Sequence, residues 1–116
     1  MADSTVWVEM TFDSAHYLPQ YEGPCKQLHG HTYKVAVGVR GRVDPLTGMV
    51  LDMAVLKNKL RNVVTPLDHR CLNDILHLPT AENIALYILQ GLGLDQYLKV
   101  IVRVYETPTS WVTVSK

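Results

Sequence analysis

The 116-residue chain has the usual length of one domain, so residues 1–116 are expected to form a single domain. Hydrophobic residues make up 47% and charged residues 19%, a balance typical of globular proteins and not of disordered or fibrous ones. Eleven basic and eleven acidic residues cancel. This neutrality argues against a nucleic-acid-binding protein but still permits a local basic patch for a small anionic substrate.

The two cysteines and the N-terminal residues indicate the cellular compartment of the protein. Cys25 and Cys71 have no Cys-x-x-Cys spacing, and nothing else suggests a secreted disulfide scaffold. The first ten residues lack the basic-then-apolar order of a signal peptide, and no apolar run approaches the roughly 20 residues that cross a bilayer. We therefore expect a cytoplasmic protein with both thiols free and no membrane partner.

The first half of the chain is predicted to contain two strands. Residues 5–11 alternate loosely and are rich in Val and Trp, whereas residues 31–43 alternate clearly with a period of two. One face of the second strand carries an aromatic residue and three valines: Tyr33, Val35, Val37 and Val39. Residues 18–26 contain two prolines, a glycine and several polar residues, and are interpreted as a loop between the strands.

Two helices are predicted in the middle of the chain. Asp52 is suited to cap the first helix, and Pro66 ends it. Residues 80–82 open the second helix, which ends near Gly91 and Gly93.

Two further strands are predicted near the end of the chain, at residues 99–106 and 111–114. The complete order is β-β-α-α-β-β, which implies an α+β fold in which an antiparallel sheet carries two helices on one face. The edges of such a sheet need covering, and partner subunits commonly cover them. We therefore also expect oligomerisation.

The densest chemical pattern is the sequence His29-Gly30-His31. Residues two apart in a strand point to the same side, so both imidazoles can converge on one ion. His16 ends the preceding strand segment and could lie opposite the pair on an antiparallel neighbour. Three protein ligands with an open fourth position are typical of catalytic zinc, although imidazoles also suit iron, nickel and copper. The alternative is a pair of polar side chains without a ligand.

Cys25 lies four residues before His29. A thiol beside a dication and imidazoles would favour its thiolate form and could act as a base or nucleophile. The alternative is a small buried side chain, which is the interpretation we apply to Cys71.

Two carboxylates add further candidates. Asp68 could orient the imidazole of His69 and raise its competence as an acid or base, the alternative being a capped turn after Pro66. Glu106 ends a strand, where a carboxylate can accept paired hydrogen bonds from a planar group with adjacent N–H donors. The alternative for Glu106 is an ordinary solvated hairpin residue.

Five short strings occur in a fixed order along nearly the whole chain: Phe-Asp-Ser-Ala-His16, Cys25-Lys-Gln-Leu-His29-Gly-His31, Leu-Asp68-His69-Arg-Cys-Leu-Asn, Pro-Thr80-Ala-Glu-Asn and Glu106-Thr-Pro-Thr-Ser. Together they resemble the family of 6-pyruvoyl-tetrahydropterin and 6-carboxytetrahydropterin synthases. The resemblance implies the tunnelling fold, in which the sheet of one subunit joins its neighbours to form a barrel. It also implies a homo-hexamer, a dimer of trimers, with active sites between subunits.

The resemblance also implies roles for the candidate residues. Zn²⁺ would be bound by the three histidines, His16, His29 and His31. Cys25 would be the catalytic thiolate, which abstracts a proton from the side chain of a pterin substrate. Asp68 and His69 would form a second acid/base unit, in which Asp68 orients His69. Glu106 would anchor the pterin through its 2-amino and ring N–H groups.

The substrate in this family is 7,8-dihydroneopterin triphosphate, from which triphosphate is eliminated. The Cys-x-x-x-His-Gly-His spacing and the short chain resemble the branch that makes 6-carboxy-5,6,7,8-tetrahydropterin and releases acetaldehyde as well, for queuosine or archaeosine biosynthesis. The alternatives are a 6-pyruvoyl-tetrahydropterin synthase, which only eliminates triphosphate, and a non-catalytic pterin-binding or metal-storage module. The resemblance assigns no residue to the triphosphate, and the basic residues available to be tested for this role are Lys26, Arg40 and Arg103.

Overall fold

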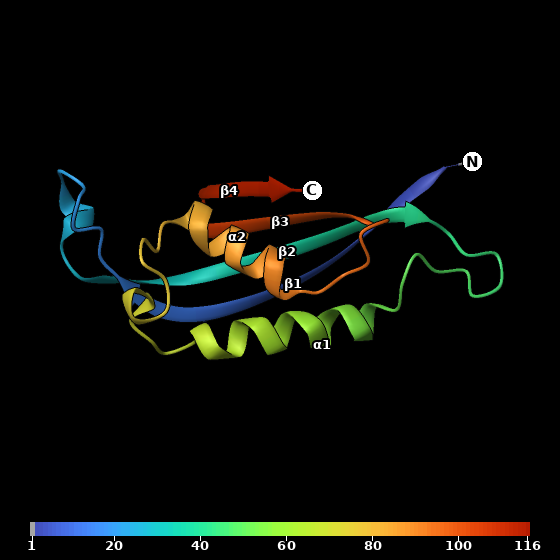
Figure 1. Cartoon of the computed structure of the whole chain (residues 1–116), viewed down its shortest axis with the longest axis horizontal. Helices are drawn as coiled ribbons and strands as arrows, with labels where there is room; N and C mark the ends of the chain where they lie inside the picture. Colours follow the sequence, from blue (N-terminus) through green and yellow to red (C-terminus); the bar gives the residue numbers. More distant parts are fainter. Residues whose placement is uncertain (1) are drawn as a thin grey trace.

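Four antiparallel strands form one sheet in the order β1-β2-β3-β4, and two helices cover one of its faces (Figure 1). The computed structural model describes residues 2–116. The strands are β1 (Asp3–His16), β2 (His29–Arg42), β3 (Lys99–Thr107) and β4 (Ser110–Ser115), and the helices are α1 (Met53–Val64) and α2 (Ala81–Gly91). Short 3₁₀ helices occupy Pro24–Lys26, Thr65–Leu67 and Leu72–Asp74. The predicted β-β-α-α-β-β order and α+β class are confirmed.

The strands β1 and β2 are longer than the hydrophobic pattern predicts. They pair continuously from Asp3 opposite Arg42 to His16 opposite His29. The polar residues that end β1 interrupt the apolar alternation, but the backbone ladder continues through them because the partner strand supplies their hydrogen bonds. The extra length carries His16 to the start of β2.

The core lies between the sheet and the helices. The predicted inner face of β2 is confirmed, since Tyr33, Val35, Val37 and Val39 are fully buried. Asp52 caps α1 by accepting a hydrogen bond from the N–H of Ala54, and the side chain of Thr80 caps α2 in the same way. The helix α1 ends two residues before Pro66, as expected from the missing N–H of proline.

The sheet opens at one end. The β2–β3 ladder runs only from Arg40 opposite Lys99 to Lys34 opposite Tyr105, so the first residues of β2 pair with β1 alone. An irregularity in the β3–β4 register lies between Tyr105 and Thr107. This end of the sheet therefore leaves room around Glu106.

No helix in residues 2–116 is long and apolar enough to span a membrane. Both cysteines are free thiols, as predicted.

Candidate functional site

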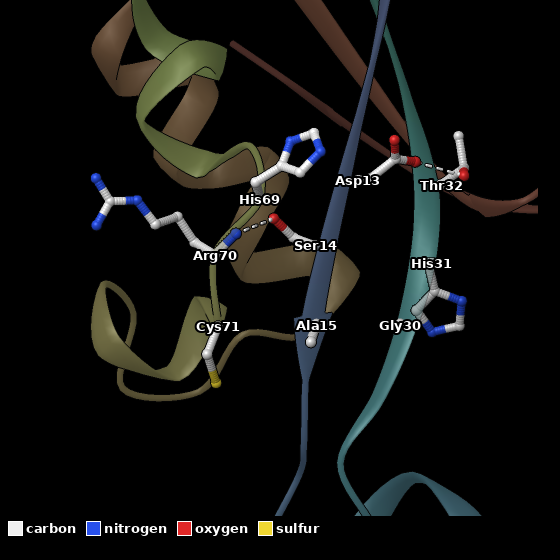
Figure 2. Close-up of a pocket in the computed structure, with 9 residues that line it drawn as sticks. All are labelled: Asp13, Ser14, Ala15, Gly30, His31, Thr32, His69, Arg70 and Cys71. Atoms are coloured by element: carbon white, nitrogen blue, oxygen red, sulfur yellow. Dashed lines mark hydrogen bonds between the residues drawn. The ribbon is translucent and has the colours of Figure 1, made fainter.

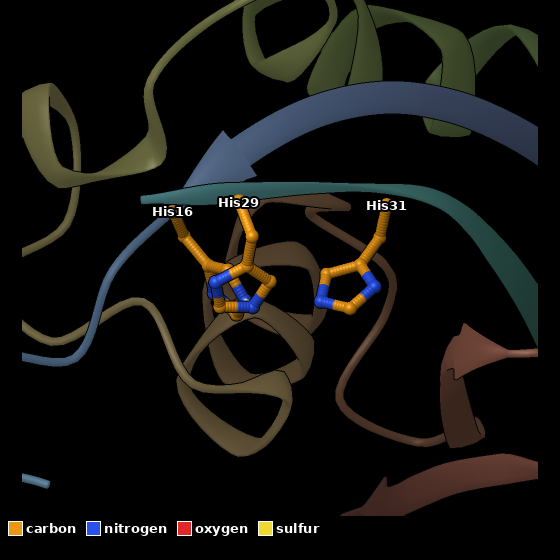
Figure 3. A group of neighbouring side chains, drawn as sticks. All are labelled: His16, His29 and His31. Carbon is orange, nitrogen blue, oxygen red and sulfur yellow. The ribbon is translucent and has the colours of Figure 1, made fainter. Parts of the chain in front are cut away.

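The three predicted histidine ligands come together on the helix-facing side of the sheet (Figure 3). His16 ends β1 and is the direct partner of His29 at the start of β2, while His31 lies two residues further along the same strand. One nitrogen of each ring lies within 4.8 Å of the other two. The period of two in β2 and the antiparallel pairing with β1 produce this convergence.

Two of the rings have their tautomer fixed by backbone carbonyls. The Nδ1 atom of His16 lies 2.7 Å from the carbonyl oxygen of Pro79, and Nδ1 of His29 lies 2.7 Å from that of Gln27. A carbonyl can only accept a hydrogen bond, so each Nδ1 donates. In the neutral rings, the Nε2 lone pairs are then free for a ligand, which is the arrangement that metal-bound histidines adopt.

The third ring, that of His31, is also suited to a metal. Its Nε2 atom is buried and has no hydrogen-bond partner among the described residues. Burial lowers the pKa of His31, and the nearby His16 and His29 lower it further, against the opposing effect of Glu106. The three side chains therefore fit a transition-metal ion that binds neutral imidazoles.

Glu106 is closer to the histidines than the sequence predicts. Its Oε1 atom lies 3.3 Å from Nε2 of His16 and 3.5 Å from Nε2 of His31. The even-numbered residues of β3 up to Val104 face the core, so the period of two alone places Glu106 on the histidine side of the sheet. The sequence interpretation considered only a substrate contact for this carboxylate.

A cleft of about 350 Å³ is lined by both Cys25 and Glu106. None of the three histidines lines it, and Glu106, 3.3 Å from Nε2 of His16, links the cleft to them. Cys25 lies in the 3₁₀ helix Pro24–Lys26 and is half-buried. Thr80, the residue that caps α2, lines the same cleft, as does Trp111 of β4. Two of the predicted functional side chains thus share one concave surface.

Glu106 also lines a second cleft, of about 480 Å³, at the open end of the sheet. Its other walls include His31, Lys34 and Tyr105. The Lys34 ammonium lies 4.2 Å from the centre of the Tyr105 ring and 3.6 Å from a carboxylate oxygen of Glu9.

Lys34 was not among the basic residues considered as triphosphate ligands. The three that were considered line none of the clefts described here: Lys26, Arg40 and Arg103. Arg40 instead pairs with Asp3 at 3.4 Å, and Arg103 donates hydrogen bonds to Thr113 and Tyr105.

Asp68 and His69 form the predicted pair, with His69 Nδ1 2.9 Å from Asp68 Oδ2. The other carboxylate oxygen of Asp68 accepts a hydrogen bond from the N–H of Asp13 at 2.9 Å. This backbone hydrogen bond is the main cause of the lowered pKa of Asp68, and the hydrogen bond with His69 adds to it. The carboxylate is therefore held in its ionised form beside the imidazole.

The Asp68–His69 pair lies in a different place from Cys25. His69 lines a shallow cleft along the outer edge of β1, where residues 69–71 run beside the strand (Figure 2). Cys71 also lines this cleft and is half-buried, whereas the sequence interpretation had it as a small buried side chain. Within one chain, the structure thus brings Cys25 together with Glu106 but puts His69 in another cleft.

Comparisons with known proteins agree with this architecture. A family model described as 6-pyruvoyl tetrahydropterin synthase matches residues 5–116. The 6-carboxy-5,6,7,8-tetrahydropterin synthase of Synechocystis sp. is 43% identical over 94 residues, which are 75% of this chain and 73% of that protein. The dihydroneopterin monophosphate aldolase of Pyrococcus furiosus is 45% identical over 78 residues, 67% of this chain and 65% of that protein.

A solved structure extends the likeness to the whole chain. The 6-pyruvoyl tetrahydropterin synthase of Caenorhabditis elegans matches with a TM-score of 0.87 at 31% identity, covering 100% of this chain and 97% of that one. The sequence motifs, the four-stranded sheet and the histidine cluster therefore lead to one assignment. The chain belongs to the 6-pyruvoyl tetrahydropterin synthase family, a family of pterin-processing enzymes.

Proposed function

We propose that this enzyme is a zinc-dependent 6-carboxy-5,6,7,8-tetrahydropterin synthase. It would convert 7,8-dihydroneopterin triphosphate with release of acetaldehyde and triphosphate, in the cytoplasmic biosynthesis of 7-deazaguanines such as queuosine or archaeosine. The observation that carries the proposal is the convergence of three imidazoles beside a cleft that contains Cys25 and Glu106. The name of the Synechocystis relative supports the choice of branch.

Zn²⁺ is the ion proposed for the three histidines, because three converging imidazoles, two of them with Nε2 lone pairs free in the neutral ring, match the ligand set of catalytic zinc sites. Bound there, the ion would polarise the side-chain oxygens of the pterin substrate as a Lewis acid.

In the cleft that both residues line, Glu106 would bind the pterin ring and Cys25 would act as the base. The carboxylate of Glu106 would accept paired hydrogen bonds from the 2-amino and ring N–H groups of the pterin, fixing the ring. The side chain of the pterin would then lie toward Cys25, whose thiolate would remove a proton from the carbon next to an oxygen.

Asp68 and His69 would act on the substrate of a neighbouring subunit in a homo-hexamer built as a dimer of trimers. Residues 69–71 cover the outer edge of β1 only at Asp13 and Ala15, and the rest of that edge pairs with no strand of the described chain, which leaves it free to extend the sheet into a barrel. Assembly at this edge would bring the exposed His69 to a cleft that holds Cys25. There His69, oriented by Asp68, would exchange the second proton.

The test is incubation of purified, metal-analysed protein with 7,8-dihydroneopterin triphosphate, followed by mass spectrometry of every product and an assay for acetaldehyde. The 6-carboxy product with acetaldehyde supports the proposal. Turnover without acetaldehyde would identify a 6-pyruvoyl-tetrahydropterin synthase instead, the activity named for the C. elegans structure. Absence of turnover with tight pterin binding would identify a non-catalytic module, and a parallel incubation with the monophosphate tests the activity named for the Pyrococcus relative.

A further inference from the structure

We propose that Glu106 is the fourth ligand of the metal centre when no substrate is bound, and that the pterin displaces it. The proposal rests on the proposed function for its metal and its substrate class. It gives the carboxylate two successive partners, first the ion and then the pterin ring.

The spacing of the ligand atoms supports coordination. Four ligands at about 2.0–2.1 Å from a tetrahedral zinc ion lie about 3.3–3.4 Å from one another. The Oε1 atom of Glu106 lies 3.3 Å from Nε2 of His16 and 3.5 Å from Nε2 of His31. The second distance is too long for a charge-assisted hydrogen bond, which is about 2.7–2.9 Å, but both distances fit two ligands of one ion.

The positions of the protons lead to the same conclusion. Because Nδ1 of His16 donates to a backbone carbonyl, its Nε2 presents a lone pair in the neutral ring. The buried Nε2 of His31 has no hydrogen-bond partner. A carboxylate oxygen facing the Nε2 lone pair of His16 at 3.3 Å is unfavourable, since both atoms are acceptors. A cation between them removes this conflict.

Burial and charge add a reason for a carboxylate in this place. The side chain of His16 is fully buried and that of Glu106 is only 31% exposed, so a dication held by neutral imidazoles would lie in a poorly solvated site. One carboxylate ligand lowers the net charge of that site from about +2 to +1. It also closes the position that the sequence analysis expected to be open.

The proposed displacement of Glu106 from the ion rests on the position of its side chain, which lines both clefts. A pterin in the cleft with Cys25 offers adjacent N–H donors to the carboxylate. When Glu106 turns to these donors, the three histidines alone would hold the ion, which would leave room there for an oxygen of the substrate. Binding the correct ring would thus open the metal centre.

The experiment uses substrate-free protein loaded with Co²⁺, which reports its coordination by visible absorption, and measures Zn²⁺ affinity by competition with a chelator. Wild type is compared with Glu106→Gln and with Glu82→Gln, a matched control that removes an exposed carboxylate lining the same cleft. We expect Glu106→Gln to change the Co²⁺ spectrum and to weaken Zn²⁺ binding at least about 10-fold. The control should keep the wild-type spectrum and affinity.

Identical spectra and affinities for wild type and Glu106→Gln would overturn the coordination. Addition of neopterin, a pterin without phosphates, to wild-type Co²⁺ protein tests displacement without any variant. A shift of the spectrum on saturation supports displacement, and an unchanged spectrum overturns it. Both readouts are independent of turnover, so a failure of the proposed reaction and a failure of the fourth ligand give different results.

Discussion

His16 and His29 are direct partners in the β1–β2 ladder, and their Nε2 atoms lie 3.0 Å apart. Both rings donate from Nδ1 to backbone carbonyls, so in their neutral forms two lone pairs face each other at this distance. A proton or a metal ion between them relieves the repulsion. The ends of β1 and β2 should therefore be more stable when an ion is bound.

Zinc is predicted to stabilise the fold through the histidines. At a free Zn²⁺ concentration 100 times the dissociation constant, the free energy of unfolding should rise by about 2.7 kcal/mol. His31→Ala removes one of the three nitrogens and should abolish most of this gain. Chemical denaturation with and without Zn²⁺ measures it. His77→Ala, which removes an exposed histidine outside the cluster, should keep the full gain. Equal stabilisation of wild type and His31→Ala would contradict this prediction.

Cys25→Ala is predicted to remove turnover without removing the metal. A well-positioned base contributes about 10²–10⁴-fold to the rate, so kcat should fall by that factor while zinc stays near one ion per chain. The comparison is Cys71→Ala, which removes a thiol whose Sγ lies 3.8 Å from the Asn73 side chain in another cleft. Steady-state rates and metal analysis of both variants test whether Cys25 is the base and whether the metal is retained without it. A similar loss in Cys71→Ala, or none in Cys25→Ala, would show that the base is another group.

The histidine cluster could be predicted from sequence because its geometry is local. A period of two puts His29 and His31 on one side of β2, and the loop of residues 17–28 returns the chain antiparallel, so that His16 meets them. The helix caps Asp52 and Thr80 were predictable for the same reason, since each bonds to an N–H two or three residues away.

The features that sequence reasoning missed depend on contacts between distant segments. The carboxylate of Glu106 reaches His16 only because the β2–β3 ladder stops at Tyr105 and leaves that end of the sheet open. Asp68 is bonded to Asp13, 55 residues earlier in the sequence. The period of two gives the face on which Glu106 lies, but no local pattern indicates either contact distance, because each depends on how β3 and the loop after α1 pack against the first two strands.

Asp68→Asn is predicted to change the pH dependence of stability. Hydrogen bonds from Asp13 N–H and from His69 hold the pKa of Asp68 below its ordinary value of 3.8. The carboxylate therefore contributes stability that is fully present above about pH 3.8 and is lost as the pH falls through the lower folded-state pKa. The variant should be less stable than wild type at neutral pH, and the difference should shrink in acid.

Urea unfolding at a series of pH values on both sides of 3.8 measures the effect of Asp68→Asn. The control is Asp74→Asn, which removes an exposed carboxylate from the neighbouring 3₁₀ helix. The prediction fails if the two variants show the same pH dependence.

His69 is predicted to carry backbone strain that glycine would relieve. Its φ of 56° makes it the one non-glycine residue with positive φ in the described chain. The left-handed conformation costs a residue with a Cβ roughly 1–2 kcal/mol, which is partly offset by the greater flexibility of unfolded glycine. His69→Gly should therefore be more stable than His69→Ala by about 0.5–1 kcal/mol in chemical denaturation. Both variants lack the imidazole, so their difference isolates the backbone.

An alanine variant as stable as the glycine variant would show that the backbone at residue 69 is unstrained. If His69→Gly is instead the more stable variant, the contacts of His69 explain why the strained backbone is kept. The left-handed turn lets the N–H of His69 donate to the carbonyl of Asp13 while its ring meets the carboxylate of Asp68 at 2.9 Å. Strained non-glycine residues persist where the surrounding contacts outweigh the cost, and they cluster at functional sites. The difference in stability between His69→Ala and His69→Gly would then measure the backbone strain that this position accepts in directing the imidazole to Asp68.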